Sequence, residues 1–266
     1  MPVRRGNPRP DFIIGGAPRS GTTFLARLLH AVRDVYLAQP LIPEPKVLIG
    51  RKPPTREEVE ARYAACFEGV PEGVLCGEKT SGYLESPLCA DRIQNHLPDV
   101  RLIFVLRHPV HRAFSNYLWT RKNGFEDRPF EEVWDLDSDM RPNPLEETHP
   151  EVRLYDYLDR SRYGARMEVY RKRFPDSQLY WMVLEAFLAD PAAEWKGLGN
   201  FLGRDLGSLQ PDALGPVNTT DGVQGSCPPG LKARVAECLK ADLEIVYGHL
   251  PKARQYWDPD LPATAS

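Results

Sequence analysis

The sequence predicts an α/β fold of three layers, α/β/α, in which helices cover both faces of a central parallel sheet. Short apolar runs alternate with amphipathic helical patterns, which is typical of strand–helix units joined by right-handed crossovers. The run Arg101–Leu106 is apolar after its first residue, as a strand buried on both faces should be. A glycine-bearing loop at 15–23 separates a strand from a helix, and such loops point backbone N–H groups at phosphates.

The loop of the first strand–helix unit reads Gly-Gly-Ala-Pro-Arg-Ser-Gly-Thr-Thr, between the apolar run 12–14 and a helical pattern. Counted from Gly16, it nearly matches the nucleotide-binding pattern GxxxxGK[ST]. Thr22 occupies the lysine position, and the nearest cation is Arg19. In nucleoside triphosphatases that lysine reaches the β- and γ-phosphates. The loop therefore predicts a P-loop-like anion site and disfavours phosphoryl transfer from ATP.

The rest of the chain continues the alternation of strands and helices. The segment 38–55 is rich in proline, and it could border a substrate cleft or be a plain surface loop. We expect one domain over 1–266, with a flexible arm at 1–10 and an irregular, substrate-side insertion at 122–152. Further strands are expected at 74–76 and 178–184, and helices at 22–32, 55–68, 86–97, 110–121, within 153–174, at 190–202 and at 229–250.

Composition narrows the choice of partners and compartment. The 266 residues carry a formal net charge of -3, which gives no overall electrostatic case for nucleic acid or an anionic membrane. No stretch approaches the roughly 20 apolar residues of a spanning helix, and the N-terminus lacks the apolar part of a signal peptide. We therefore expect a cytoplasmic protein without a membrane partner. The five cysteines lack metal-ligand spacing, so we expect reduced thiols and no metal site, with a Cys227–Cys238 disulfide left open.

Two further strand ends carry side chains that could bind a ligand or take part in catalysis. Arg107 ends a strand, and Ser115 follows about one turn into the next helix; together they could hold a second phosphate, or Arg107 could pair with a surface carboxylate. Glu78 follows another strand, where a carboxylate could act as general base. In a regular strand Glu78 and Lys79 point to opposite faces, so both reach one cleft only if the chain bends at Gly77. An ordinary surface pair is the alternative.

Three segments resemble those of one enzyme family. GAPRSGTTFL resembles the 5′-phosphosulfate loop of sulfotransferases that use 3′-phosphoadenosine 5′-phosphosulfate (PAPS). VLRHPVHRAFSNY resembles their 3′-phosphate motif, RxPxxRxxSxY. GEKTSGYL resembles the segment with the catalytic glutamate in the heparan sulfate branch, and the similarity covers roughly 11–35, 75–120 and 160–205. Together these segments are a specific signature, whereas each one alone is weak.

The resemblance implies a PAPS-dependent sulfotransferase that acts on a hydroxyl or amine of a small metabolite or saccharide, with cations instead of a metal. Glu78 would take the proton from the acceptor, Lys79 would neutralise the sulfuryl group, and Arg19 would also stabilise the leaving phosphate. Arg107 and Ser115 would hold the 3′-phosphate. The 5′-phosphosulfate would be held by Arg19, Ser20, Gly21, Thr22 and Thr23.

The sequence also departs from that family, and two other functions stay open. The heparan sulfate branch usually has lysine where this chain has Arg19, and its Thr-Lys-Gly-Phe segment is echoed at 219–222 without the lysine. One alternative is a P-loop kinase or nucleoside triphosphatase, in which Glu185 after an apolar strand would imitate the magnesium-binding carboxylate. The other is a non-catalytic nucleotide-binding protein.

Overall fold

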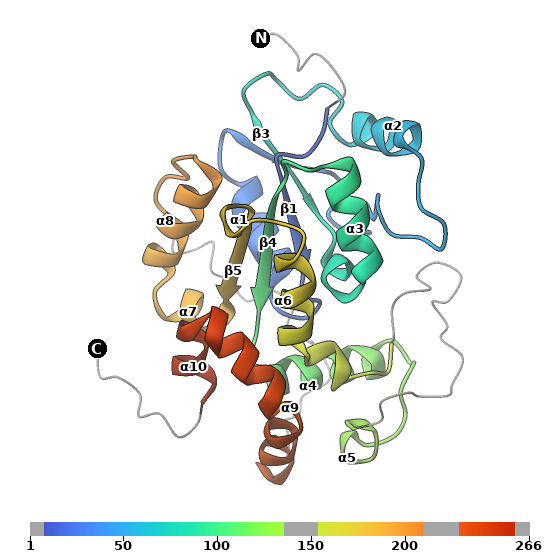
Figure 1. The fold of residues 1–266 in the computed structure, drawn as a ribbon, viewed down its shortest axis with the longest axis vertical. Helices are drawn as coiled ribbons and strands as arrows, with labels where there is room; N and C mark the ends of the chain where they lie inside the picture. Colours follow the sequence, from blue (N-terminus) through green and yellow to red (C-terminus); the bar gives the residue numbers. More distant parts are fainter. Residues whose placement is uncertain (1–7, 136–153, 210–228, 259–266) are drawn as a thin grey trace.

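The computed structural model describes residues 8–135, 154–209 and 229–258, and in this part of the chain a parallel sheet of five strands lies at the centre (Figure 1). Its order is β2-β3-β1-β4-β5, and every neighbouring pair is parallel, so the carboxyl ends of the strands share one edge. The predicted α/β class is confirmed. The strands are β1 (Phe12–Gly16), β2 (Val35–Leu37), β3 (Leu75–Lys79), β4 (Arg101–Leu106) and β5 (Leu179–Val183).

Helices cover both faces of the sheet. In Figure 1, β4 and β5 run towards the end of the molecule where α4, α7 and α9 lie. The short 3-10 turns are η1 (Ser81–Glu85), η2 (Asp159–Ser161) and η3 (Asp176–Gln178). The α-helices of the described ranges are α1 (Thr22–His30), α2 (Arg56–Cys66), α3 (Pro87–His96), α4 (Pro109–Lys122), α5 (Phe130–Val133), α6 (Tyr163–Arg171), α7 (Leu184–Ala189), α8 (Pro191–Leu202), α9 (Pro229–His249) and α10 (Pro251–Trp257).

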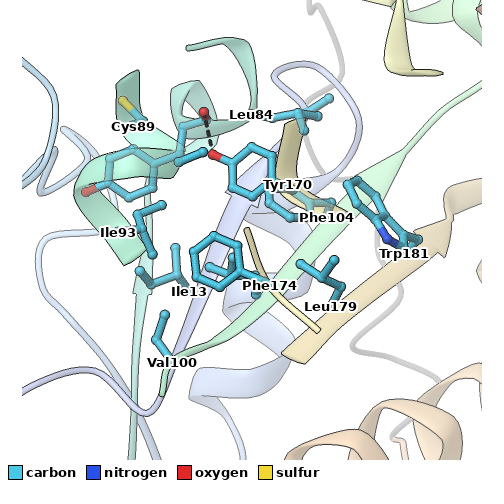
Figure 2. Packing of buried hydrophobic residues seen from close by; sticks show 14 of the residues in the cluster. Ile13, Leu84, Cys89, Ile93, Val100, Phe104, Tyr170, Phe174, Leu179 and Trp181 are labelled. Atoms are coloured by element: carbon cyan, nitrogen blue, oxygen red, sulfur yellow. Dashed lines mark hydrogen bonds between the residues drawn. The ribbon is translucent and has the colours of Figure 1, made fainter. Parts of the chain in front are cut away.

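The two faces of the sheet bury two separate cores. Residues of α1 and α8 pack on one face, and residues of α2, α3 and α6 pack on the other. Figure 2 shows the second core around Phe104, whose ring lies 4.6 Å from those of both Tyr170 and Trp181, centroid to centroid. The Tyr170 hydroxyl donates a 2.7 Å hydrogen bond to the backbone oxygen of Tyr83. The aromatic side chains of α6 are therefore part of the core.

The register of β3 decides which face each of its last two side chains occupies. Ile13 pairs with Glu78 and belongs to the core of α2, α3 and α6, whereas Ile14 pairs with Lys79 and belongs to the core of α1 and α8. Paired residues of parallel strands point to the same face. Because β3 runs unbroken through Gly77, the chain does not bend there, and Glu78 and Lys79 lie on opposite faces.

Local signals in the sequence explain where α2 begins. The Thr55 hydroxyl accepts a hydrogen bond from Glu58 N, and the Glu58 carboxylate accepts one from Thr55 N, which forms a capping box at the predicted helix start. Arg9 donates to Glu60 of α2 at 2.8 Å. Arg9 belongs to the predicted N-terminal arm, whose first seven residues lie outside the described part.

Three elements and one segment differ from the sequence prediction. The helix α7 was not predicted, because it is short and fills the connection between the expected strand at 178–184 and the expected helix at 190–202. The strand β2 was not predicted, because a three-residue apolar run shows no alternation. The helix α10 was not predicted either, since it follows α9 after a single residue. The described part of the expected insertion contains α5, and Phe130 and Trp134 are buried against α4 rather than irregular. The remainder of the insertion, from 136 on, lies outside the described residues.

We expect Gly77→Ala to destabilise the protein by about 1–3 kcal/mol, because a Cβ there would lie 2.1 Å from Cζ of Phe12 across the β1–β3 pair. Thermal or denaturant unfolding measures the change. Gly248→Ala is the matched control, because a Cβ at this helical position meets no atom within 4 Å and should be neutral or slightly stabilising. Equal stability of the two variants would contradict this packing.

Candidate active site

The loop between β1 and α1 follows a path that its glycines permit. Gly21 has a φ of 91° and forms the N-cap of α1, a conformation that favours glycine. At Gly16 a Cβ would lie 2.5 Å from Cβ of Leu84, so a side chain would push the loop away from η1. Arg19 has a φ of 67°, which is uncommon for a residue other than glycine and marks a position held by its surroundings. The loop is thus a closely packed turn that ends at a helix N-terminus.

This helix N-terminus is a favourable place for an anion. Gly21 supplies no side-chain cap and the first turn of α1 holds no acidic residue, so its N–H groups are left without such a partner. The helix dipole adds partial positive charge there. Ser20, Thr22 and Thr23 are buried around the same turn. The five residues predicted for the 5′-phosphosulfate, Arg19 to Thr23, are therefore consecutive in this turn.

Three arginines lie close enough at this loop to repel one another. Burial, followed by the charges of Arg107 and Arg160, lowers the pKa of Arg19 to about 10. Nη1 of Arg107 donates to the backbone oxygen of Arg19 at 3.4 Å. Nε of Arg19 is buried and makes no hydrogen bond within the described part of the chain. A bound anion would satisfy this atom and offset the repulsion, so the arrangement fits an anion site.

The second predicted phosphate site begins at the end of β4. The backbone oxygen of Arg107 accepts a 3.0 Å hydrogen bond from the Tyr163 hydroxyl, which ties this residue to α6. Ser115 lies in the second turn of α4, deeper than the one turn expected, and is partly buried. The structure therefore brings Arg107 to the Arg19 loop, with Ser115 on the helix that starts at Pro109.

A carboxylate that the sequence did not single out lies beside Lys79. Nζ of Lys79 is 2.9 Å from Oε1 of Glu44 and donates to Oγ1 of Thr23 at 3.2 Å. Glu44 also accepts hydrogen bonds from Oγ of Ser81 at 2.8 Å and from N of Ser81 at 3.1 Å. The side chain of Glu44 is 17% exposed, against 3% for Lys79. Lys79 thus connects an accessible carboxylate with the first turn of α1.

Glu78 has a different environment, because it is wholly buried on the other face of β3. Its carboxylate accepts hydrogen bonds from the hydroxyls of Tyr63 at 2.5 Å, Thr80 at 2.6 Å and Tyr83 at 2.7 Å. Burial raises the pKa of Glu78 and outweighs the three hydrogen bonds, which lower it, while the charge of Glu44 raises it further. The arrangement in which Glu78 and Lys79 share one cleft is not found.

Sequence reasoning missed two residues of this region. Glu44 lies in the proline-rich segment 38–55, where no periodicity or motif marks a single glutamate, and the folded chain alone brings it to Lys79. Arg160 is buried, with Nε 2.7 Å from Glu85 and Nη1 2.7 Å from Asn116. Two features named from the sequence, the 219–222 segment and Cys227, lie outside the described residues.

Comparison with known proteins places these features in a family. Residues 10–207 match the sequence profile of the sulfotransferase family. Heparan sulfate glucosamine 3-O-sulfotransferase 6 of Mus musculus is 26% identical over 215 residues, which cover 76% of this chain and 56% of that protein. The crystal structure of a sulfotransferase from Alicyclobacillus acidocaldarius has the same fold, with a TM-score of 0.71 at 24% identity and coverage of 91% of this chain and 96% of that one. The chain spans about half the length of the curated heparan sulfate relatives that it matches.

The predicted cytoplasmic location is corrected by another relative. Membrane-associated sulfotransferase kil1 of Dictyostelium discoideum is 29% identical over 131 residues, which cover 43% of this chain and 24% of that protein. In the described ranges, no helix combines the length and the apolar character needed to span a bilayer. That observation does not determine the compartment, because the chain spans only part of the length of these relatives.

We expect Arg19→Met to raise the Tm of the ligand-free protein by a few degrees, because it removes a buried charge that Arg107 and Arg160 repel. The folded-state pKa of Arg19 lies below that of the unfolded chain, so the cost is fully present at any pH below about 10 and is relieved as the pH rises above it. Calorimetry at low and high salt measures the effect. Arg27→Met, at an exposed position of α1, should leave Tm nearly unchanged, and a lower Tm for Arg19→Met would refute the repulsion.

Proposed function

This chain belongs to the sulfotransferase family, and we propose that it transfers a sulfuryl group from PAPS to a hydroxyl or amine of a small metabolite or saccharide. One observation carries the proposal: an anion-binding turn and an accessible carboxylate meet at one edge of the sheet. The turn holds Arg19, which lies beside Arg107. The carboxylate is Glu44, and Lys79 joins it to Thr23 of the same turn.

The side chains and backbone amides of this turn suit PAPS as the sulfuryl donor. The first-turn N–H groups of α1 and the hydroxyls around them would hold the 5′-phosphosulfate, and Nε of Arg19, which has no partner among the described residues, would donate to it. The guanidinium of Arg19 is planar and carries several N–H donors. It therefore suits the oxygens of phosphate and sulfate better than the single ammonium group of a lysine would. Arg107, together with Ser115, would hold the 3′-phosphate.

The proposed reaction is an in-line displacement at sulfur. A bond forms between the acceptor oxygen or nitrogen and sulfur, while the bond from sulfur to the bridging oxygen of the 5′-phosphate breaks and 3′-phosphoadenosine 5′-phosphate leaves. Lys79 would neutralise the sulfuryl oxygens, and Arg19 would stabilise the charge on the leaving phosphate. The acceptor proton passes to a carboxylate. Positioning and charge stabilisation would supply most of the rate, by analogy with phosphoryl transfer.

Two carboxylates compete for the role of general base. Glu44 is accessible and forms an ion pair with Lys79, which in turn contacts the anion-binding turn. Glu78, the residue that the sequence resemblance suggests, is fully buried and already accepts hydrogen bonds from three hydroxyls. A base must come within hydrogen-bond reach of the acceptor. The geometry therefore favours Glu44, and the role of Glu78 stays a prediction.

The environment of Glu185 weakens the case for an ATP-dependent enzyme. Its Oε1 accepts from N of His108 at 2.8 Å, and its Oε2 accepts from Nε1 of Trp257 at 2.9 Å. Both oxygens thus join the start of α4 to α10, which is a structural task. Thr22 still occupies the position of the phosphate-binding lysine.

For the acceptor, we propose a small metabolite or a saccharide of low charge. A polyanionic glycan would call for a strongly basic surface, whereas the chain carries a net charge of -3. Ile42, which is 64% exposed, lies two residues before Glu44 and adds an exposed apolar side chain to this loop. Incubating a metabolite extract with enzyme and PAPS, followed by mass spectrometry, identifies the molecules that gain sulfate.

Calorimetric titration should show tight binding of 3′-phosphoadenosine 5′-phosphate and weak binding of ATP with Mg²⁺. AMP lacks the 3′-phosphate and is expected to bind more weakly. Arg107→Met should weaken binding of the bisphosphate to the level of AMP and leave AMP affinity nearly unchanged, because the lost charge faces the 3′-phosphate. Tighter binding of ATP with Mg²⁺ than of the bisphosphate would overturn the proposed donor.

Glu44→Gln should lower kcat by roughly 10²–10⁴-fold, the range typical of a lost general base, and should leave the affinity for 3′-phosphoadenosine 5′-phosphate unchanged. Release of this product from PAPS, with an acceptor from the metabolite screen, measures kcat. Glu78→Gln tests the competing assignment in the same assay. If Glu78→Gln abolishes turnover while Glu44→Gln retains it, the base is Glu78.

A further inference from the structure

We propose that Glu78 is a positioning residue, which holds the backbone after Glu44 in place through the hydroxyls of Thr80 and Tyr83. The proposal rests on the proposed function in one respect, namely that Glu44 is the base. It gives a role to a buried carboxylate that the transfer itself, as described above, does not use.

The two hydroxyls form a relay between Glu78 and the segment that follows Glu44. Oγ1 of Thr80 donates to Oε1 of Glu78 at 2.6 Å and accepts from N of Lys46 at 3.1 Å. The hydroxyl of Tyr83 donates to the same oxygen at 2.7 Å and accepts from N of Leu48 at 3.2 Å. A hydroxyl carries one proton, so donating it to the carboxylate leaves the lone pairs for the amide. Glu78 thereby orients both hydroxyls as acceptors.

An ionised carboxylate suits this position because it can only accept. Tyr63 of α2 donates to Oε2 of Glu78 at 2.5 Å, so both carboxylate oxygens are occupied. Glutamine in the same place would present an N–H group to at least one of the three hydroxyls. With its NH2 group at the position of Oε1, glutamine would force the hydroxyls of Thr80 and Tyr83 to turn their protons elsewhere, and the relay would fail. With its NH2 group at the position of Oε2, glutamine would affect the hydrogen bond of Tyr63 alone. Leucine, which accepts no hydrogen bond, removes the acceptor for both relay hydroxyls.

Other side chains bind the carbonyls of the same segment, so its backbone is held on both its donor and its acceptor sides. Arg62 donates to the backbone oxygens of Pro45 and Val47, each at 2.9 Å. Arg92 donates to those of Leu48 and Gly50, also at 2.9 Å. Residues 45–50 are thus tied to α2, η1, α3 and Thr80, the residue that follows β3.

The backbone conformation at Lys46 shows why such support is needed. Its φ is 52°, in the left-handed region that residues other than glycine adopt at a cost, and such residues persist where their surroundings over-determine them. Lys46 lies two residues after Glu44, and its N–H group is one end of the relay. Releasing that N–H group removes one of the contacts that hold the strained turn, and the carboxylate of Glu44 would then move relative to Lys79.

Hydrogen–deuterium exchange tests the relay without any acceptor. In Glu78→Leu, Thr80→Val and Tyr83→Phe, a peptide covering residues 44–50 should exchange several-fold faster than in the wild type. Thr80→Ser keeps the hydroxyl and should restore slow exchange. Tyr63→Phe is the matched control, because it removes a hydrogen bond to Glu78 that does not lead to the segment. Equal acceleration in Tyr63→Phe would overturn the proposal, since general loosening of the core would explain it.

Turnover tests whether the relay acts through Glu44. Thr80→Val and Tyr83→Phe should each lower kcat by about 10- to 100-fold, as displacement of a catalytic group by about 1 Å does, with unchanged affinity for 3′-phosphoadenosine 5′-phosphate. In the Glu44→Gln background, the same substitutions should cost nothing further. Multiplied losses in the double variants would overturn positioning through Glu44. If Glu44→Gln retains wild-type turnover, the assignment of the base fails instead, and the exchange result still decides whether the relay exists.

Discussion

Side chains alternate across the sheet along β3, and this alternation separates the two charged residues at the end of the strand. Lys79 faces α1, where it joins Thr23 to Glu44, whereas Glu78 faces α2 and is enclosed by three hydroxyls. A slip of one residue between β1 and β3 would exchange these faces and leave an ammonium without its carboxylate in the core. The pairing that builds the sheet therefore also sorts the charges of the candidate site.

The positive charge at the glycine loop destabilises the ligand-free protein, and the rest of the structure compensates only part of it. Arg19, Arg107 and Arg160 repel one another, and burial adds to the cost. Arg160 is compensated by its ion pair with Glu85, whereas Nε of Arg19 has no partner within the described residues. Sites that are built for a ligand commonly carry such unfavourable interactions in the ligand-free state. The distribution of compensated and uncompensated charge thus indicates where the anion belongs.

Much of the fold was predictable because its signals are local. The apolar run of β4 and the start of α2 at Thr55 were both predicted from neighbouring residues. The site was only partly predictable. The glycine loop and Arg107 follow strand ends, and parallel strands bring such ends together. The contact between Glu44 and Lys79 joins an irregular loop to a strand, so it could not be predicted from the periodicity of the sequence. The local pattern around Glu78 suggested a base, but only the register shows which face this carboxylate occupies.

The order of the strands also accounts for how an in-line transfer could be arranged. β1, which leads into the glycine loop, lies between β3 and β4. Lys79 at the end of β3, with Glu44 from the loop after β2, lies to one side of β1, and Arg107 at the end of β4 lies to the other. A donor held by the loop and by Arg107 would extend its adenylate towards β4, so its sulfuryl group would face Lys79 and Glu44. Displacement at sulfur requires the acceptor to approach opposite the leaving group, and with the proposed donor this strand order would leave the side of Lys79 and Glu44 for the acceptor.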